Sequence, residues 1–268
     1  MATKKGATKG TQKKDAKTPS RAGAKSRRAG ARAEAKAVAG DAQASNRSKG
    51  KGAERGPKRP TGTAMPGPAR DPRLPEPGTV LRKVDRQGRF WAGSMDDAQR
   101  HASGALYRID ANRSVTLIDD DYRIANGPAF SPDGRIMYHN DTGRQVTYAF
   151  DLDVDGRASN RRVLIEHPPD GGHPDGITVD LEGCIWIALW GGWCVRRFST
   201  SGECLQTVRL PVEQPSSCAF GGPDLDRLFV TSAREDLNEG ALSKQPSAGG
   251  LFMLDVGVKG IPEIPFAG

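Results

Sequence analysis

An apolar run of six residues recurs four times in this chain, at residues 89–94, 135–140, 184–189 and 227–232. Each copy has the composition of a β-strand, and the first three copies follow tight turns that end in glycine. The copies begin 46, 49 and 43 residues apart. A repeat of this length is typical of one propeller blade, so the spacing favours a β-propeller over a helical solenoid.

Further strand patterns fill the intervals between the copies. A second set lies at residues 104–110, 146–151, 194–198 and 250–255, and a third set lies at residues 114–118, 162–165 and 205–210. Antiparallel strands joined by short turns and repeated at this interval describe four-stranded blades around a central axis. No amphipathic helix pattern follows residue 76, so the predicted fold class is all-β.

The chain changes composition near residue 75. Residues 1–75 carry 20 Lys or Arg and 5 Asp or Glu, whereas residues 76–268 carry 20 and 27. The first segment contains no aromatic residue and almost no Leu, Ile or Val, so it cannot bury enough apolar surface to fold. We therefore predict a disordered basic low-complexity tail at 1–75 and a partial β-propeller domain at 76–268.

The basic tail allows three interpretations. It could make weak, salt-sensitive contacts with nucleic acid or another anionic partner, although it has no aromatic residue to stack on bases. It could be a solvated extension without function or an artefact of the gene model, and its Ala-, Ser- and Arg-rich composition also resembles an organelle transit peptide. Neither a secretory signal nor a membrane span is predicted, which favours a cytoplasmic protein.

The four cysteines do not form a metal-binding pattern. They are Cys184, Cys194, Cys204 and Cys218, and no two are spaced as a Cys-x-x-Cys pair. Without a secretory signal, we expect reduced thiols that fill small positions in the fold.

Two oxygen-bearing residues precede successive copies of the repeated run. Asn126 and Asp175 lie 49 residues apart, each followed by glycine, in segments that we interpret as turns entering the blades. Equivalent positions on successive blades converge on one end of the central channel, where a carboxylate and an amide oxygen could bind a divalent cation. The alternative is structural, because Asn-Gly and Asp-Gly are common turn formers and a turn aspartate can cap its own backbone.

An ordered set of motifs makes the domain recognisable. The set comprises residues 88–95, 104–107, 126–134, 174–177, 217–222, 249–252 and 260–262. Together they resemble the gluconolactonase and regucalcin-like (senescence marker protein-like) sugar-lactonase family, from about residue 83 to residue 266. The resemblance implies a six-bladed β-propeller with a divalent metal in its channel, of which the visible repeats supply about four blades.

The resemblance also implies an activity and a site. Asn126 and Asp175 match two protein ligands of the family metal, and Asp175 could also take part in proton transfer. The implied reaction is hydrolysis of a sugar lactone to an aldonic acid, with one divalent cation as cofactor. Oxygen ligands suit Ca, Mg, Mn, Zn or Fe(II), so the sequence leaves the identity of the metal open.

The chain departs from the family pattern before the first repeated run. An Arg-x-Asn-Asp-Gly substrate motif is absent from its place at residues 78–82, and we assign no ligand role to Glu76 although the family supplies a glutamate from its first blade. Asp96 and Asp97 lie where some relatives place a substrate-contacting carboxylate, and of the two we assign Asp97 to the substrate. The alternative for both is a pair of solvated loop acids. Whether the chain is a lactonase-type hydrolase or a non-catalytic metal-binding or interaction module stays open.

Three explanations fit a propeller with about four blades of six. The reading frame could be truncated or start at the wrong place, the chain could be completed by self-association through its open edges, or the domain could be a degenerate binding module. The abrupt change of composition near residue 75 favours the first explanation.

Overall fold

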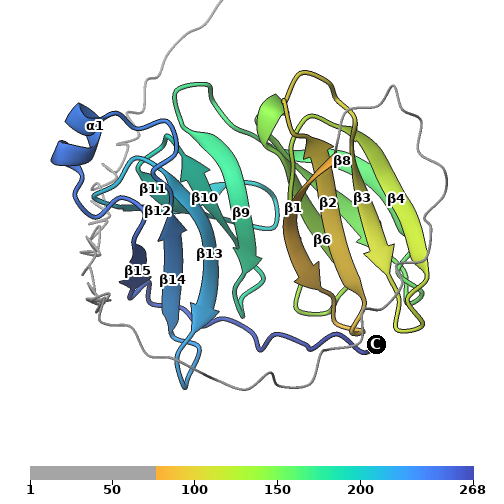
Figure 1. Cartoon of the computed structure of the whole chain (residues 1–268). Helices are drawn as coiled ribbons and strands as arrows, with labels where there is room; N and C mark the ends of the chain where they lie inside the picture. Colours follow the sequence, from red (N-terminus) through yellow and green to blue (C-terminus); the bar gives the residue numbers. More distant parts are fainter. Residues whose placement is uncertain (1–76) are drawn as a thin grey trace, which may run out of the picture. The chain divides into compact units, whose positions relative to one another are not determined.

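The described part of the chain forms four antiparallel sheets. The computed structural model describes residues 77–268, with side chains from Arg82 onward, so the predicted tail at 1–75 lies outside the described residues. Three sheets have four strands and the fourth has three (Figure 1). Sheet 1 contains β1 (Pro77–Val84), β2 (Phe90–Asp96), β3 (Gly104–Ile109) and β4 (Val115–Tyr122). Sheet 2 contains β5 (Ala125–Phe130), β6 (Ile136–Asp141), β7 (Val146–Leu152) and β8 (Ala158–Glu166). Sheet 3 contains β9 (His173–Val179), β10 (Ile185–Trp190), β11 (Cys194–Phe198) and β12 (Cys204–Arg209), and sheet 4 contains β13 (Pro215–Gly221), β14 (Arg227–Ser232) and β15 (Leu251–Leu254).

The repeated run is the second strand of every sheet. Its four copies correspond to β2, β6, β10 and β14, and the predicted second and third sets of strands correspond to the strands that follow them in each sheet. The prediction of an all-β propeller fold with about four blades is confirmed. Only two short helices interrupt the strands of residues 77–268, the 3₁₀ turn η1 (Thr142–Arg144) and α1 (Glu239–Lys244).

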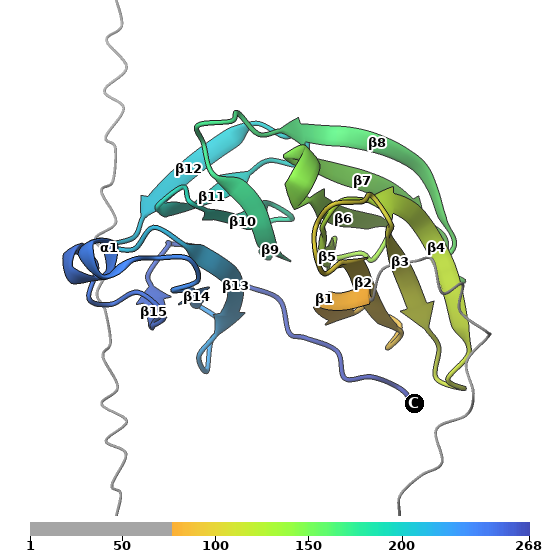
Figure 2. The ribbon, with the colours of Figure 1, turned by 45° about the horizontal axis from the view of Figure 1, so that its top comes forward.

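The segments predicted as turns entering the blades are strands. Residues 126–130 lie in β5 and residues 173–178 lie in β9, so both are first strands of their sheets. The first strands contact one another in the order β1, β5, β9 and β13, and they are innermost in Figure 2. A cavity of about 180 Å³ lies between them and is lined by Arg82, Lys83, Gly127, Pro128, Ile177, Ser217, Cys218 and Ala219.

Apolar side chains form a core between each pair of successive sheets. Trp91, Phe130 and Met137 belong to the core between sheets 1 and 2. Two further cores lie between sheets 2 and 3 and between sheets 3 and 4, with Ile187 and Phe252 among their buried members. This sheet-to-sheet packing holds the four first strands side by side.

Buried aspartates anchor two of the turns that precede the repeated run. The Asp180 carboxylate accepts hydrogen bonds from the backbone N–H groups of Glu182 and Cys184, from Nε1 of Trp186 at 2.9 Å and from Nε of Arg197 at 2.7 Å. Asp85 does the same in sheet 1, where its partners include Nε1 of a tryptophan at 2.8 Å and Nε of an arginine at 2.6 Å. The repeat therefore has a structural basis, because in both sheets a tryptophan and an arginine donate hydrogen bonds to a buried aspartate of the turn.

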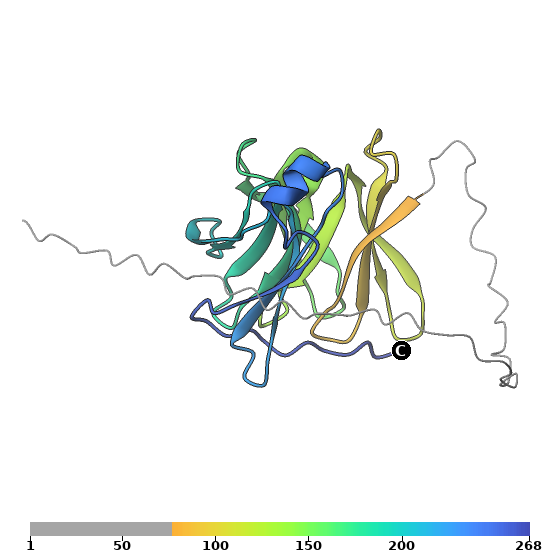
Figure 3. The same ribbon diagram turned by 60° about the vertical axis from the view of Figure 1, so that its left-hand side comes forward.

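The last residues of the chain cross from sheet 4 to sheet 1 (Figures 1 and 3). The N–H of Gly260 donates to the carbonyl of Leu225 at 2.8 Å, and Glu263 forms an ion pair with Lys83 at 2.6 Å. At sheet 1, the N–H of Ala267 donates to the carbonyl of Gly88 at 3.0 Å. We call residues 257–268 the C-terminal strap.

Two further predictions concern cysteines and membranes. All four cysteines are free thiols, with Cys194 and Cys218 buried and Cys204 exposed. In the part of the chain that the structure describes, no helix combines the length and the hydropathy needed to cross a membrane.

Candidate functional site

The structure places Asn126 and Asp175 on neighbouring inner strands. Asn126 is the second residue of β5 and Asp175 is the third residue of β9, and the two strands pack side by side (Figure 2). Both residues therefore lie at the same end of the inner strands, which we call the ligand end. The tight turns that follow β5 and β9 lie at the opposite end, which we call the turn end.

The glycines after both residues serve close packing of the strands. A Cβ at Gly127 would lie 2.9 Å from Cγ2 of Ile177 on β9, and Gly127 also has a φ of +108°. A Cβ at Gly176 would overlap Oγ of Ser217 on β13. Asn-Gly and Asp-Gly are therefore not turns here, because each glycine lets the next inner strand approach.

Asn126 presents an amide oxygen without a protein partner. Its side chain is buried, and Nδ2 donates to Oγ1 of Thr142 at 2.7 Å. Among residues 77–268, Oδ1 has no hydrogen-bond partner although it is shielded from solvent. An unpaired buried carbonyl costs about 1 to 3 kcal/mol, and a bound ligand that accepted this oxygen as its partner would offset that cost.

Asp175 carries a carboxylate in a poorly solvated position. Burial raises the pKa of Asp175 to about 7, because removal from water disfavours the charged form. Within the described residues, the carboxylate forms no ion pair, and no hydrogen bond from its own backbone caps it. A nearby positive charge would restore the ionised form.

The two residues have the donor atoms that a divalent cation requires. An amide oxygen without a partner and a carboxylate without a counter-charge are hard ligands of the kind that Ca²⁺, Mg²⁺ or Mn²⁺ prefers. Residues 77–268 contain no cluster of three or more His, Cys, Asp or Glu side chains around a common point. Asn126 and Asp175 are therefore the two candidate cation ligands among the side chains that the structure describes.

Asp97 lies in the loop that follows β2. Its side chain is exposed, and the end of β2 is tied to the ligand end by a bridge between Met95 and Ile124. The neighbouring Asp96 is buried and accepts hydrogen bonds from the backbone N–H groups of Ala98, Arg100 and His101. Asp96 thus shapes the loop, and Asp97 is free to contact a ligand.

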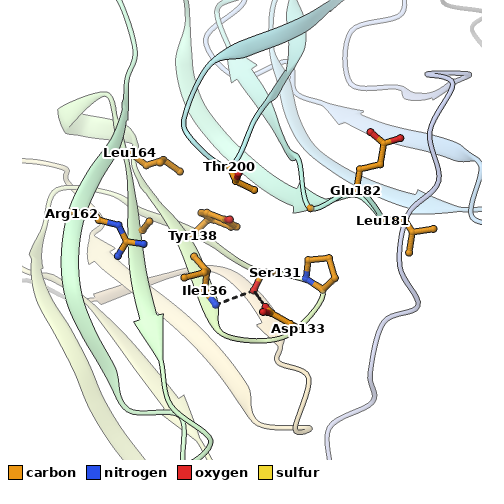
Figure 4. A pocket seen from close by; sticks show the side chains of 12 residues that line it. Ser131, Asp133, Ile136, Tyr138, Arg162, Leu164, Leu181, Glu182 and Thr200 are labelled. Atoms are coloured by element: carbon orange, nitrogen blue, oxygen red, sulfur yellow. Dashed lines mark hydrogen bonds between the residues drawn. The ribbon is translucent and has the colours of Figure 1, made fainter.

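A larger cavity lies at the turn end, between sheets 2 and 3 (Figure 4). It measures about 480 Å³ and is lined by Ser131, Pro132, Asp133, Ile136, Tyr138, Ala149, Arg162, Leu164, Leu181, Glu182, Gly183 and Thr200. Its acids have partners, because Asp133 accepts from Oγ of Ser131 at 2.6 Å and Glu182 pairs with Arg197 at 2.6 Å. This cavity lies at the end of β5 and β9 that Asn126 and Asp175 do not occupy.

Sequence reasoning missed two residues of the site, Asn140 and Thr142. Nδ2 of Asn140 donates to the backbone carbonyl of Asp175 at 2.7 Å, and Oγ1 of Thr142 donates to that of Pro174 at 2.6 Å. Asn140 ends a copy of the repeated run and Thr142 follows two residues later, but the other copies have no equivalent pair. Their only sequence signal is that polar residues end an otherwise apolar run.

A family model matches residues 82–234 of the chain, which covers most of sheets 1 to 4. The model is described as the SMP-30/Gluconolactonase/LRE-like region. The match includes Asn126, Asp175 and Asp97.

Individual proteins show the same similarity over the same part of the chain. The chain is 40% identical over 187 residues to 6-deoxy-6-sulfogluconolactonase of Pseudomonas putida, and 40% identical over 195 residues to regucalcin of Sus scrofa. Both alignments cover 69% of this chain, and they cover 64% and 65% of the two relatives. The chain thus spans slightly less than two thirds of the length of these relatives.

Solved structures support the fold assignment. A calcium-binding protein, regucalcin, from Agrobacterium tumefaciens superposes with a TM-score of 0.67 at 33% identity, over 70% of this chain and 64% of that one. A luciferin-regenerating enzyme superposes with a TM-score of 0.65 at 34% identity, over 70% of this chain and 65% of that one.

Proposed function

The chain belongs to the SMP-30/gluconolactonase/LRE-like family, and from that premise we propose that it hydrolyses a sugar lactone in a reaction that requires a divalent cation. The observation that carries the proposal is the pairing of a buried Asn126 Oδ1, which has no partner among the described residues, with a half-buried Asp175 carboxylate at one end of the inner strands. The names of the relatives support the substrate class, since one acts on a gluconolactone derivative.

The proposed reaction adds water across the ester bond of the ring. A water oxygen forms a bond to the carbonyl carbon, the bond from that carbon to the ring oxygen breaks, and the ring oxygen receives a proton to become a hydroxyl. The product is an open-chain aldonic acid. A bound divalent cation would supply Lewis acidity at the lactone carbonyl and at water.

The side chains contribute binding and proton transfer. Asn126 and Asp175 would hold the cation, and Asn126 would do so without adding a second negative charge. With a cation bound, the Asp175 carboxylate would be ionised, which is the form that can take a proton from water and return it to the ring oxygen. Asp97, exposed beside the ligand end, would bind hydroxyl groups of the sugar.

The test is hydrolysis of several aldonolactones by the purified full chain, followed as acid release above the spontaneous rate. Calcium, magnesium, manganese, zinc and iron(II) are added singly after treatment with a chelator. We expect turnover with at least one cation, and a loss of about 100-fold or more in Asp175→Asn, because that variant loses both the charge and the proton acceptor.

A control substitution on the same strand tests whether a change in β9 alone affects turnover. Thr178→Val changes a buried residue of β9 that has no part in the proposed site, and it should retain turnover. Turnover that is equal in the wild-type chain and in Asp175→Asn, or that survives complete removal of cations, would overturn the proposal.

A second candidate is a cation-binding module without catalysis. It is favoured by residues 78–82, where neither the arginine nor the asparagine of the Arg-x-Asn-Asp-Gly motif that the family resemblance leads us to expect stands in its place. Calorimetry would then show cation binding that Asp175→Asn removes, while no lactone is hydrolysed by either protein.

A further inference from the structure

Two hydrogen-bonded Thr–Asn pairs, Thr142 with Asn126 and Thr147 with Asn140, link sheet 2 to the strand that carries Asp175. We propose that Thr142 and Asn140 are positioning residues: together they turn Oδ1 of Asn126 toward the cation and fix the backbone that carries Asp175. This inference rests on the proposed function and extends it to residues that do not themselves touch the cation.

The hydroxyl of Thr142 sets the orientation of the Asn126 amide. The hydroxyl has one proton, and it donates that proton to the backbone carbonyl of Pro174 at 2.6 Å. A carbonyl can only accept, so toward Asn126 the same hydroxyl must act as an acceptor. Its partner at 2.7 Å is therefore Nδ2, the donating end of the amide, and Oδ1 points away from Thr142.

This orientation leaves the amide oxygen available for a ligand. Oδ1 is buried and has no partner among the described residues, which is costly for a group that serves only the fold. If Thr142 had no hydroxyl, nothing on that side would distinguish the oxygen of Asn126 from its nitrogen. The amide would then populate both orientations, and the cation would have to select one.

A second chain of hydrogen bonds fixes the next carbonyl along β9. Nδ2 of Asn140 donates to the backbone carbonyl of Asp175 at 2.7 Å, so Oδ1 of Asn140 faces Thr147, whose hydroxyl donates to it at 2.6 Å. The Thr147 hydroxyl already donates its proton to Asn140. Nε2 of His167, which lies 2.9 Å from Oγ1 of Thr147, must therefore donate to that hydroxyl. Burial, with a smaller effect of Arg196, lowers the pKa of His167 to about 4, so the ring is neutral and carries its proton on Nε2.

The residues that hold the backbone of Asp175 are themselves fixed by burial and hydrogen bonds. Asn140 and Thr147 are fully buried, and Asn140 lies opposite Asn126 in the pairing of β5 with β6. Thr142 begins η1, whose N-cap Asp141 is buried and accepts from the N–H of Arg144, while the N–H of Thr142 donates to the carbonyl of Ile124 at 3.0 Å. Consecutive carbonyls, those of Pro174 and Asp175, are thus both bound by side chains from sheet 2.

The experiment measures cation affinity by calorimetry, with calcium chloride and manganese chloride as the probes. Three variants of the full chain are compared with the wild type: Thr142→Val, which removes the hydroxyl at nearly constant shape, Thr142→Ser, which keeps it, and Thr178→Val. We expect binding to weaken at least tenfold in Thr142→Val, a typical effect of removing an outer-shell partner, and to equal that of the wild type in the other two.

Thr147→Val keeps the proposal testable if Thr142→Val does not fold. It lies farther from the cation and removes only the donor that orients Asn140, so we expect binding to weaken by about threefold. Thermal unfolding of each cation-free variant is recorded in parallel, because a purely structural role would lower stability without changing affinity.

The outcomes separate this inference from the proposed function. If the wild-type chain binds a cation and Thr142→Val binds it equally well, the positioning role is overturned and the proposed function stands. If Thr142→Ser fails to restore affinity, the hydroxyl is not the orienting group and the inference is also overturned. If the wild-type chain binds neither cation, both fail together.

Discussion

Asp175 and Asp180 stand five residues apart at opposite ends of β9, and the protein treats their charges in opposite ways. Asp180, at the turn end, is completely buried, and its carboxylate accepts two backbone and two side-chain hydrogen bonds, one of them from the guanidinium of Arg197. Asp175, at the ligand end, has no counter-charge among residues 77–268, and burial raises its pKa to about 7.

The contrast separates a structural acid from the acid to which we assign a function in our proposal. At the turn end, the Asp180 carboxylate accepts four hydrogen bonds, so its charge stabilises the turn and the repeated run after it. At the ligand end, an amide oxygen and a carboxylate have no side-chain partners within residues 77–268, and Asn140 and Thr142 bind the backbone carbonyls of Asp175 and Pro174. Buried polar groups without partners are costly, and such costs concentrate at functional sites.

The largest effect is expected at the satisfied acid. Asp180→Ala leaves Nε1 of Trp186 and the guanidinium of Arg197 without their buried acceptor, so the free energy of unfolding should fall by about 3 to 5 kcal/mol. Urea denaturation followed by tryptophan fluorescence measures it. Asp85→Ala is the matched variant in sheet 1 and should behave alike; a loss below about 1 kcal/mol in both would remove the structural half of the comparison.

A smaller effect on stability is expected at Asp175, and it should depend on the cation. Asp175→Asn removes a charge that the fold does not compensate, so the cation-free variant should be no less stable than the wild type at pH 7.5. With cation at 100 times its Kd, the wild type should gain about 2.7 kcal/mol and the variant nothing. Thermal unfolding with and without cation measures both effects, and equal stabilisation of the two proteins would contradict the comparison.

Acid should destabilise the protein through a third buried group. Burial, with a smaller effect of Arg161, lowers the pKa of His139 from 6.5 to about 3, and both of its ring nitrogens lack partners within the described residues. Between pH 6.5 and pH 3, His139 is protonated in the unfolded chain but stays neutral in the folded chain. Stability should therefore fall as the pH drops from 6.5 toward 3, by up to tenfold in the unfolding constant per pH unit.

His139→Phe provides the control for that pH dependence. The phenyl ring keeps the edge contact with Tyr122, whose ring centroid lies 4.7 Å from that of His139, but it cannot be protonated. In the variant, the slope of the free energy of unfolding against pH should decrease between pH 6.5 and pH 5 by the contribution of one proton. The contribution of His167 should remain. An unchanged slope in the variant would show that His139 does not drive the acid sensitivity.

The smallest effect is expected at the ion pair of the C-terminal strap. Glu263 is half exposed where it meets Lys83 at 2.6 Å, and such pairs contribute less than about 1 kcal/mol. Glu263→Gln should lower stability by less than that amount, and the difference should vanish in 1 M salt. A larger, salt-independent loss would indicate that the strap is held by this contact rather than by its backbone hydrogen bonds.

The strands of the repeated run were predictable from sequence, and the inner strands were not. Residues 135–140 differ by one residue at each end from β6, Ile136–Asp141, because an apolar run between polar turns has one plausible conformation. The inner strands β5 and β9 contain Asn-Gly and Asp-Gly, which locally favour turns. Only the approach of β9 and β13 in three dimensions shows why glycine is needed at Gly127 and Gly176.

The candidate site was predictable only in its two ligands. Asn126 and Asp175 stand out by their equivalent spacing, so the prediction that they share one end of the inner strands follows from the repeat alone. Thr142 and Asn140 occur in one sheet only, and a repeat carries no signal for a feature that it does not copy. Their role depends on which atom donates and which accepts, and that information exists only in the folded structure.

The C-terminal strap also has a consequence for the order of folding. Arg86 donates to the carbonyl of Pro262 at 2.8 Å across a separation of 176 residues, whereas neighbouring sheets are joined by contacts close in sequence. Contacts between distant residues carry the highest loop-closure entropy and form late. Sheets 1 to 4 can therefore assemble one after another along the chain, and docking of the strap on sheet 1 is the closing step that couples the first sheet to the last in a single cooperative unit.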